Sequence, residues 1–250
     1  MNELVADKGR LRRVRKLARL ARVSLYRSGL RLGVAATNEH DDVPLGDSDF
    51  RTVIDVGAHH GQFALFAARR YPAARLYCLE PYEASRARLE RLRRLLPQLE
   101  ILPFAAAEDE STRQLHLSRK TDSSSLLPIL ESYTAAFPGT EEAALVPVQT
   151  RTLDHLRSDL QLERPVLLKI DVQGTELAVL RGAAEMLQNV DSIFVECSFV
   201  EFYRGQPLAG DVVAHLNDRF VLAGAFSVVR DRRGEALQAD LLFRRRNGAH

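Results

Sequence analysis

Hydrophobic residues from Arg51 onward form short β-rich runs that alternate with stretches of helical periodicity. Strands are expected where apolar and β-branched residues run together, and helices where apolar residues recur at spacings of three and four. This alternation is typical of βαβ units, which build a parallel sheet with helices on its faces. The predicted strands are 52–56, 75–80, 100–106, 166–171 and 192–197, and the predicted helices are 62–70, 82–96, 175–187 and 208–219.

The end of the chain departs from this alternation. Residues 225–230 and 237–244 are predicted to be two strands joined by a turn at 232–234, which gives an antiparallel hairpin. The whole sheet is therefore expected to be mostly parallel, with an antiparallel end. Rossmann domains that bind nicotinamide dinucleotides do not usually end in this way.

The middle of the chain, from Glu108 to Val148, is predicted to be irregular apart from a short strand at 114–118. It contains three consecutive serines, Ser123 to Ser125, and two prolines, Pro128 and Pro138. An interruption of this length in a regular sheet is usually functional or forms a lid.

The segment from Lys8 to Arg31 carries ten Lys or Arg residues and no acidic residue. An apolar stripe at helical spacing predicts an amphipathic helix. Two interpretations stand: the helix contacts anionic lipid headgroups or a phosphorylated acceptor, or it packs on the domain with its arginines in water. A loop at 37–49 follows. We therefore expect an N-terminal basic extension and linker over 1–48 and one domain over 49–250.

Composition limits the remaining classes. The chain has 250 residues, 46% of them hydrophobic, and a net charge of +2, which suits one α/β domain and does not indicate a polyanionic partner, so nucleic acid is not an expected partner. Cys78 and Cys197 lie in apolar runs and are expected to be reduced core thiols of a cytoplasmic protein. No apolar run is long enough for a spanning helix, and no zinc-ligand spacing or phosphate-binding loop is present, so no metal is expected.

The strongest motif is the run from Val53 to Gln62, in which an apolar strand leads into a glycine turn that opens a helix. Gly57 permits the tight turn, and Gly61 lets the start of the helix approach a ligand. Glu80 lies nineteen residues after Gly61, at the end of the next strand. A carboxylate there can accept hydrogen bonds from both hydroxyls of a ribose, so the motif predicts a nucleoside site.

Two residues of the turn indicate which nucleoside. A dinucleotide site has a second glycine where this chain has His59, and Asp55 places a carboxylate that would repel a pyrophosphate. An acid suits the neighbourhood of a cationic nucleoside that bears an amino acid, and S-adenosylmethionine is such a ligand. The spacing therefore favours methyl transfer over hydride transfer.

Several motifs together resemble the FkbM family of methyltransferases. They are the glycine turn at 55–62, Leu-Glu-Pro at 79–81, Leu-Asp at 153–154 and, above all, Lys-Ile-Asp-Val-Gln-Gly-Thr-Glu at 169–176, and the likeness extends from Val53 to about Phe243. One departure is Gln173, where the family usually has Glu; this substitution removes a charge beside Asp171 and argues against a divalent-metal site.

The resemblance implies a Rossmann-like class I methyltransferase fold with a seven-stranded sheet, and S-adenosylmethionine as cofactor. It implies further that Gly57, Ala58 and Gly61 lie along the methionine part of the cofactor. Glu80 and Pro81 would lie at its ribose, and Ala107 and Glu108 at its adenine. It also implies O-methylation of a carbohydrate or secondary-metabolite hydroxyl, so a small molecule or glycan is the expected acceptor.

The reacting groups are expected at the carboxyl ends of strands, where the ligand crevice of an open parallel sheet lies. Asp171 and Glu196 fall at such ends, and Lys169 shares a strand face with Asp171. We predict that Asp171 is the general base or acceptor anchor and that Lys169 biases its charge. A structural ion pair is the alternative for Lys169 and Asp171. His59 is a second candidate base, and Glu176 is interpreted as an acid favoured at a helix N-terminus.

Three other functions stay open from the sequence alone. The first is an NAD-linked oxidoreductase. The second is a non-catalytic methyltransferase-like module that binds a membrane or a partner through residues 8–31. In that second case the protein would be peripheral to the inner face of the membrane. The third is a nucleic-acid methyltransferase, which the basic helix permits although no Asn-Pro-Pro-Tyr-like motif is present.

Overall fold

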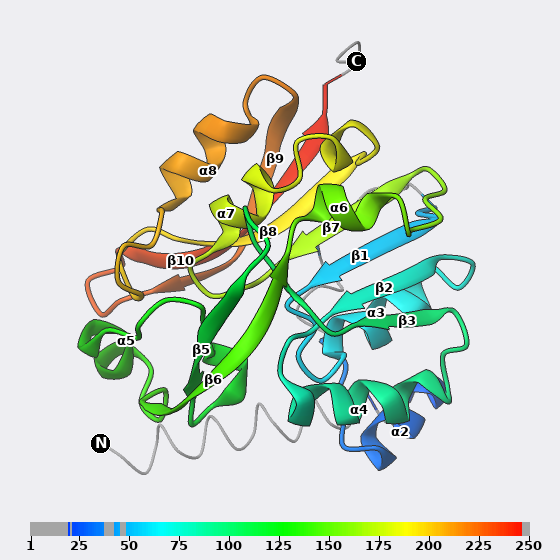
Figure 1. The fold of residues 1–250 in the computed structure, drawn as a ribbon, viewed down its shortest axis with the longest axis horizontal. Coiled ribbons are helices and arrows are strands. Elements are labelled where there is room, and N and C mark those ends of the chain that lie inside the picture. The colour runs from blue at the N-terminus through cyan, green and yellow to red at the C-terminus, as the bar shows by residue number, and fades with distance from the viewer. Residues whose placement is uncertain (1–19, 21, 38–42, 46–48, 247–250) are drawn as a thin grey trace.

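The computed structural model describes residues 20, 22–37, 43–45 and 49–246, and its main feature is one seven-stranded sheet (Figure 1). The strand order is β3-β2-β1-β7-β8-β10-β9, and β10 is antiparallel to both of its neighbours while the other pairs are parallel. The predicted α/β fold with a C-terminal hairpin is confirmed. The strands are β1 (Thr52–Val56), β2 (Arg75–Leu79), β3 (Leu99–Leu102), β7 (Val166–Ile170), β8 (Ser192–Ser198), β9 (Phe220–Arg230) and β10 (Ala236–Arg245).

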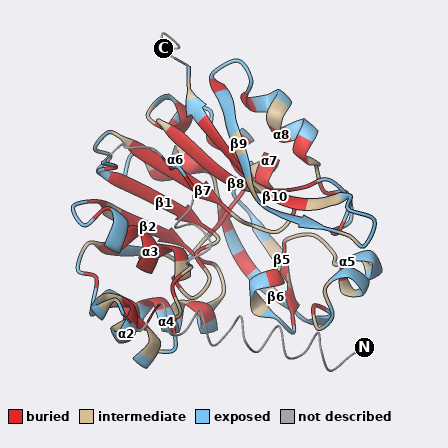
Figure 2. Cartoon of the chain, turned by 180° about the vertical axis from the view of Figure 1, so that it is seen from behind, coloured by how far each residue is buried: buried red, intermediate tan, exposed pale blue. Residues whose placement is uncertain are grey.

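The register of the central strands decides where a site can form. Val56, the last residue of β1, pairs with Leu79 of β2 on one side and with Ile170 of β7 on the other. The three strands therefore end at the same level, and the residues that follow them are brought together at one edge of the sheet. All five residues of β1 and of β7 are buried (Figure 2), because helices cover both faces of a parallel sheet.

Two hydrophobic cores lie on the two faces of the sheet. Val53 of β1 packs with α3 (Gln62–Arg70) and α4 (Glu83–Arg93), whereas Ile54 and Val56 pack with α6 (Leu153–Arg157), α7 (Glu176–Arg181) and α8 (Ala209–Leu216). This division follows from the alternation of side chains along a strand. Cys78 and Cys197 are buried free thiols, one in each core.

The described part of the N-terminal segment packs on the domain. Helix α2 (Ser24–Arg31) places Tyr26 and Gly29 in the same core as α3, and a Cβ on Gly29 would lie 2.4 Å from Leu65 Cδ2. Residues 8–19 and 21, which carry most of the predicted basic helix, lie outside the described residues, so the predicted membrane contact stays a prediction. No described helix is long and apolar enough to cross a membrane.

A second sheet occupies the middle of the chain, where the prediction of an irregular segment is wrong. Its order is β4 (Ala105–Ala106), β6 (Glu142–Arg151), β5 (Thr112–Ser118), with β5 and β6 antiparallel. Pro147 hid β6 in the sequence, because proline cannot donate to a ladder. The proline is tolerated because β4 pairs only with Thr150 and Arg151, which leaves no neighbour on that edge at Pro147.

Two predicted elements are shorter than expected. The predicted strand 100–106 is divided at Pro103 into β3 of the large sheet and β4 of the small one. The predicted helix 175–187 stops at Arg181, and a separate 3-10 turn, η2 (Met186–Gln188), follows. The break falls at Gly182, where the carbonyl oxygen of Ala107 would lie 2.1 Å from a Cβ, so the chain turns where another segment crosses it closely.

Candidate active site

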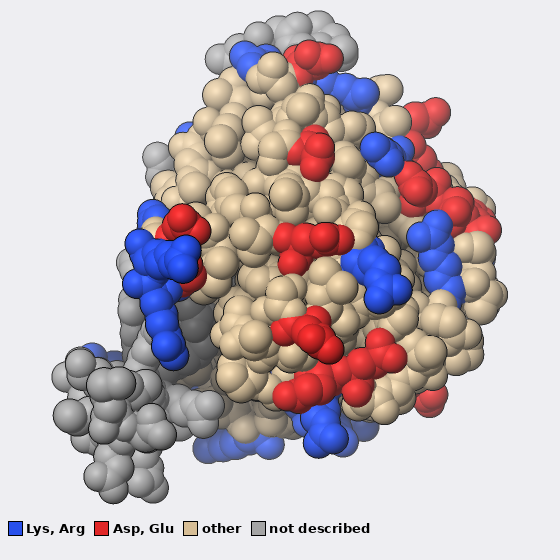
Figure 3. All heavy atoms as spheres, turned by 90° about the vertical axis from the view of Figure 1, so that its left-hand side faces the viewer, with Lys and Arg blue, Asp and Glu red and all other residues tan. Residues whose placement is uncertain are grey.

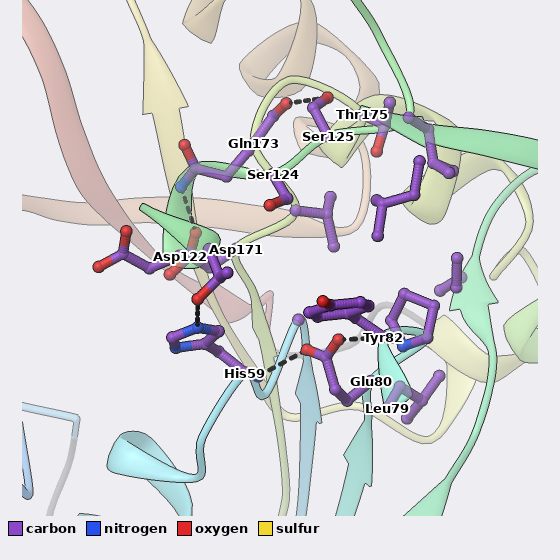
Figure 4. A pocket seen from close by; sticks show the side chains of 18 of the residues that line it. His59, Leu79, Glu80, Tyr82, Asp122, Ser124, Ser125, Asp171, Gln173 and Thr175 are labelled. Carbon is purple, nitrogen blue, oxygen red and sulfur yellow. Dashed lines mark hydrogen bonds between the residues drawn. The ribbon is translucent and has the colours of Figure 1, made fainter. Parts of the chain in front are cut away.

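A cavity lies at the carboxyl ends of β1, β2 and β7, beneath the segment that joins β5 to α5 (Glu131–Ala136) (Figure 4). We call this segment, residues 119–130, the cap; it contains the 3-10 turn η1 (Thr121–Ser123). The large sheet supplies one wall, and the small sheet and the cap supply the other. The lining residues are Gly57, His59, Leu79, Glu80, Pro81, Tyr82, Phe104, Ala105, Ala106, Leu115, Thr121, Asp122, Ser124, Ser125, Leu126, Asp171, Val172, Gln173 and Thr175.

Gly57 brings the ends of β1 and β7 together. It has φ +79°, and a Cβ there would lie 1.9 Å from the carbonyl oxygen of Asp171. Gly61 also has a positive φ, but its surroundings differ. A Cβ there would lie 2.8 Å from Cδ2 of Leu89 and 2.8 Å from Cδ2 of Leu92, both on α4. Gly57 therefore lines the cavity, whereas Gly61 serves the packing of α3 against α4.

Glu80 is a buried carboxylate held at the cavity wall. Its Oε2 accepts a hydrogen bond from the backbone N–H of His59 at 2.8 Å, and its Oε1 accepts one from Tyr82 N–H at 2.8 Å (Figure 4). Burial raises the pKa of Glu80 to about 7, although the two N–H groups favour the charged form. The acid is thus fixed at the end of β2, with Pro81 beside it in the lining.

Asp55 and Lys169 form a buried ion pair behind the glycine turn. They are register neighbours on β1 and β7, and Lys169 Nζ lies 3.0 Å from Asp55 Oδ1 and 3.5 Å from Asp171 Oδ2. Burial disfavours the charged ammonium, but the Asp55 and Asp171 carboxylates outweigh it and raise the pKa of Lys169. Asp55 is 1% exposed and lines neither cavity, so it neutralises Lys169 from within the core.

A second cavity continues from the first on the far side of His59. The two cavities share Gly57, His59, Asp122 and Asp171, and the second is also lined by Thr37, Ala58, Gln62, Phe63 and Lys169. Thr37 Oγ1 and Gln62 Oε1 are buried and have no hydrogen-bond partner among the described residues. Unsatisfied buried oxygens are rare in folded proteins, and their presence here fits a cavity that receives a polar ligand.

Asp171 lies where the two cavities meet, at the end of β7. Gln173 Nε2 donates to Asp171 Oδ1 at 2.7 Å and to Glu196 Oε2 at 2.7 Å, so Gln173 joins the two carboxylates. Burial and the charge of Asp171 raise the pKa of Glu196 well above its usual range. Glu196 does not line either cavity; it supports Asp171 from β8.

Two residues predicted to border the adenine do not line the cavity. Ala107 is buried, and its backbone N–H donates a hydrogen bond to the carbonyl oxygen of Arg151. Glu108 is exposed and forms an ion pair with Arg181 at 3.6 Å. Neither residue lines the cavity. Phe104, Ala105 and Ala106 line it instead. Leu115 of β5 also escaped prediction, because only the unpredicted pairing of β5 with β6 brings it to the site, whereas the cap lies in the interruption predicted to be functional or a lid.

His59 and Glu176 have defined partners. His59 has φ +47°, and its Nε2 lies 2.8 Å from Thr121 Oγ1, which ties the glycine turn to the cap. Burial lowers the pKa of His59 to about 4, so the ring is neutral near pH 7. Glu176 accepts N–H groups of Gly174 and Val172 at the start of α7, and its burial raises its pKa to about 7.

Comparison with known proteins gives the family. The family model described as "Methyltransferase FkbM domain" matches residues 55–220. The 2-O-methyltransferase NoeI of Sinorhizobium fredii is 26% identical over 192 residues, covering 74% of this chain and 79% of that protein. Methyltransferase sdnD of Sordaria araneosa is 29% identical over 207 residues, covering 72% and 75%.

A solved structure shows the same fold. The methyltransferase FkbM from Methylobacillus flagellatus KT superimposes with a TM-score of 0.51 at 16% identity, covering 78% of this chain and 44% of that one. This chain therefore corresponds to less than half of that longer chain. Together with the family match, which spans most of the chain, the motifs around Gly57, Glu80 and Asp171 have a single explanation: the protein belongs to the FkbM family of methyltransferases.

Proposed function

We propose that this protein transfers the methyl group of S-adenosylmethionine to a hydroxyl of an uncharged, polyhydroxylated acceptor such as a carbohydrate or a secondary metabolite. The observation that carries the proposal is Glu80, a carboxylate 6% exposed that two backbone N–H groups hold at the wall of a cavity. A rigid acceptor pair of this kind suits the two vicinal hydroxyls of a ribose.

The two joined cavities fit the two ends of the cofactor. Adenosine belongs in the first cavity, between Tyr82 and the small sheet, with its ribose at Glu80. The amino-acid end belongs in the second, where Thr37 Oγ1 and Gln62 Oε1 lack partners among the described residues and the carboxyl groups of Asp122 and Asp171 suit an ammonium group. Gly57 lines both cavities and leaves a Cβ-free passage between them. When bound, the cofactor supplies an activated methyl group on its sulfonium.

Asp171 is the residue we assign to the acceptor hydroxyl. It lines both cavities and its side chain keeps 35% of its exposure, whereas Lys169 beside it is 8% exposed. Transfer to a hydroxyl requires that its proton be accepted and that its oxygen be held in line with the methyl group. Asp171 can do both, and Lys169 Nζ, 3.5 Å from its Oδ2, places a positive charge beside it. His59 is the weaker candidate base, because its Nε2 lies 2.8 Å from Thr121 Oγ1 and its Nδ1 lies 3.4 Å from Gln62 Nε2, so both ring nitrogens already have partners.

Charge at the reacting end limits the acceptor. Asp122 and Asp171 line the junction of the cavities and Glu196 lies behind them, while Lys169 is already paired with two carboxylates. A phosphorylated or carboxylated acceptor would meet like charge there. Among the described residues on the face shown in Figure 3, acidic and basic side chains are interspersed, so these residues offer no extended basic surface to a polyanion. The similarity to NoeI, a 2-O-methyltransferase, supports oxygen as the methyl acceptor.

The test begins with the cofactor. Titration calorimetry should detect binding of S-adenosylmethionine and S-adenosylhomocysteine but no binding of NAD. This result separates a methyltransferase from the oxidoreductase alternative. Transfer of labelled methyl is then measured over a panel of neutral glycosides and matched glycoside phosphates and uronates. We expect neutral members to be methylated and Asp171→Asn to lose at least about a hundredfold in turnover with cofactor binding intact. Absence of affinity for both adenosyl compounds would overturn the proposal.

A further inference from the structure

Gln173 lies at the centre of a hydrogen-bond network that the methyl-transfer assignment has not used. Its side-chain nitrogen donates to carboxylates on two neighbouring strand ends, Asp171 after β7 and Glu196 on β8, each at 2.7 Å. Its side-chain oxygen lies 2.9 Å from the hydroxyl of Tyr203 and 3.4 Å from that of Tyr133. One amide therefore contacts four polar groups from four separate segments.

The chemistry of these partners suits a primary amide. Its two N–H bonds can each serve one carboxylate; its oxygen can accept from the Tyr133 hydroxyl and shares the single proton of the Tyr203 hydroxyl with the carbonyl oxygen of Ser123. A reversed amide would set its oxygen against two carboxylates. An ionised glutamate would offer no donor, and a hydrocarbon side chain would remove one partner from each of the four polar groups. The network therefore specifies an amide, oriented as observed.

The same residue is attached to the cap. Tyr203 Oη lies 3.0 Å from the carbonyl oxygen of Ser123, and Tyr133 Oη lies 3.2 Å from Ser123 Oγ, so both tyrosines connect Gln173 to the cap turn. Ser125 Oγ donates to the backbone carbonyl of Gln173 at 2.6 Å (Figure 4). Gln173 has φ +58°, an unfavourable conformation for a residue with a side chain, which indicates that its surroundings hold it in place.

We propose that Gln173 is a positioning residue that keeps Asp171 and Glu196 together as a working pair and fastens the cap over the cavity. The amide compensates the repulsion between two carboxylates on adjacent strands, and its tyrosine contacts make the cap's position depend on the same side chain. This inference rests on the proposed function, because a working pair is needed only where Asp171 handles an acceptor proton.

Two variants separate the two roles. Gln173→Glu keeps an acceptor for the tyrosines but loses the donor to the carboxylates, whereas Gln173→Leu loses both. Gln149→Glu is the matched control, since Gln149 is exposed on β6 and the change in net charge is the same. The rate of amide hydrogen exchange in residues 116–127 measures how firmly the cap is held, and this measurement needs no methyl acceptor. We expect exchange to be about fivefold faster in Gln173→Leu and close to wild type in Gln173→Glu and in the control.

The pH profile of turnover tests whether Asp171 and Glu196 act as a pair. It is measured with an acceptor identified in the glycoside panel. The charged and titratable groups that face the pair are Lys169, His59, Glu176, Asp240, Tyr133 and Tyr203. A third carboxylate beside Asp171 and Glu196 makes it harder for Asp171 to lose its proton. Gln173→Glu should therefore lower kcat at least about tenfold and move the acid limb of the pH profile of kcat to higher pH. The KM for the cofactor should not change.

The outcomes are distinct. Wild-type exchange in the cap of Gln173→Leu, or a wild-type pH profile and kcat in Gln173→Glu, overturns the inference. If Gln173→Leu does not fold, the profile of Gln173→Glu decides alone. If the wild type binds no adenosyl compound, the proposed function fails, and the exchange result still decides whether Gln173 holds the cap.

Discussion

Glu80 combines two properties that usually exclude each other, since it is almost fully buried and yet carries a carboxylate on a cavity wall. The N–H groups of His59 and Tyr82 reduce the cost of this burial without removing it, because the pKa of Glu80 is still raised to about 7. Part of its capacity to accept hydrogen bonds is therefore left for a ligand, and ligand hydroxyls would stabilise the charged form further.

Replacement of this acid should weaken cofactor binding. We expect Glu80→Gln to lower the affinity for S-adenosylhomocysteine about tenfold to a hundredfold, because hydrogen bonds to a charged acceptor are lost. Because a group with a pKa of about 7 is ionised only above that pH, wild-type affinity should fall as the pH drops from 8 to 6, and the variant should show no such fall. Calorimetry over this range measures both effects, with exposed Glu83→Gln as control; a pH-dependent variant would contradict the assignment.

The spacing of Gly57 and Glu80 could be predicted because it follows from strand length and the turn alone. The surroundings of Gly61 and Asp55 could not, since their partners come from α4 and β7, far away in the chain. Gln173 shows the same limit: its type was visible as a departure from a pattern, but its four partners depend on tertiary contacts that no local spacing reveals.

Gly57 offers a test of backbone geometry with a matched partner. Gly57 and Gly205 both have positive φ, at +79° and +74°, but a Cβ at Gly205 would meet nothing within 4 Å. We expect Gly205→Ala to cost about 1 kcal/mol of unfolding free energy from the left-handed conformation alone. Gly57→Ala adds the collision with Asp171 and should cost at least about 3 kcal/mol. Urea denaturation measures the free energy of unfolding of both variants. Equal losses of stability would mean that the ends of β1 and β7 do not approach each other this closely.

Among the elements, the long periodic ones could be predicted and the interrupted ones could not. β1 and α3 have the predicted bounds, because each is one uninterrupted apolar run or stripe. β6 contains Pro147, and its exposed positions read as loop, so the small sheet was missed, although the interruption that holds the cap is predicted to be functional or a lid. The error is therefore concentrated on the side of the cavity away from the large sheet.

The packing of α2 on α3 gives a prediction at this scale. Gly29 lies in α2 against the fully buried Leu65, whereas Gly210 in α8 faces open space. Alanine is a better helix former than glycine at either site, by up to about 1 kcal/mol. We expect Gly210→Ala to stabilise the protein and Gly29→Ala to destabilise it by about 1–2 kcal/mol through overpacking. Thermal unfolding compares them, and a gain at both sites would show that α2 is not packed on the domain.

At the scale of the whole molecule, both sheets line the cavity, so a ligand there would contact both. His59 reaches Thr121 across the site and Gln173 reaches Ser125, so the large sheet is already joined to the cap through polar contacts. Polar contacts exposed to a cavity stabilise less than a packed core. We therefore expect the cap to be the least protected wall of the site until a ligand fills the space beneath it.

Cofactor binding should then protect both walls together. S-adenosylhomocysteine at a hundred times its Kd should raise the free energy of unfolding by about 2.7 kcal/mol, because only the folded state binds it. Hydrogen exchange should slow in the glycine turn at 57–61 and also in the cap at 121–126, although some sixty residues separate them in the chain. Leu145 and Val146 on the outer part of β6 line neither cavity and serve as the internal control. Protection confined to the glycine turn would mean that the ligand lies on the large sheet alone, and that the small sheet has no part in holding it.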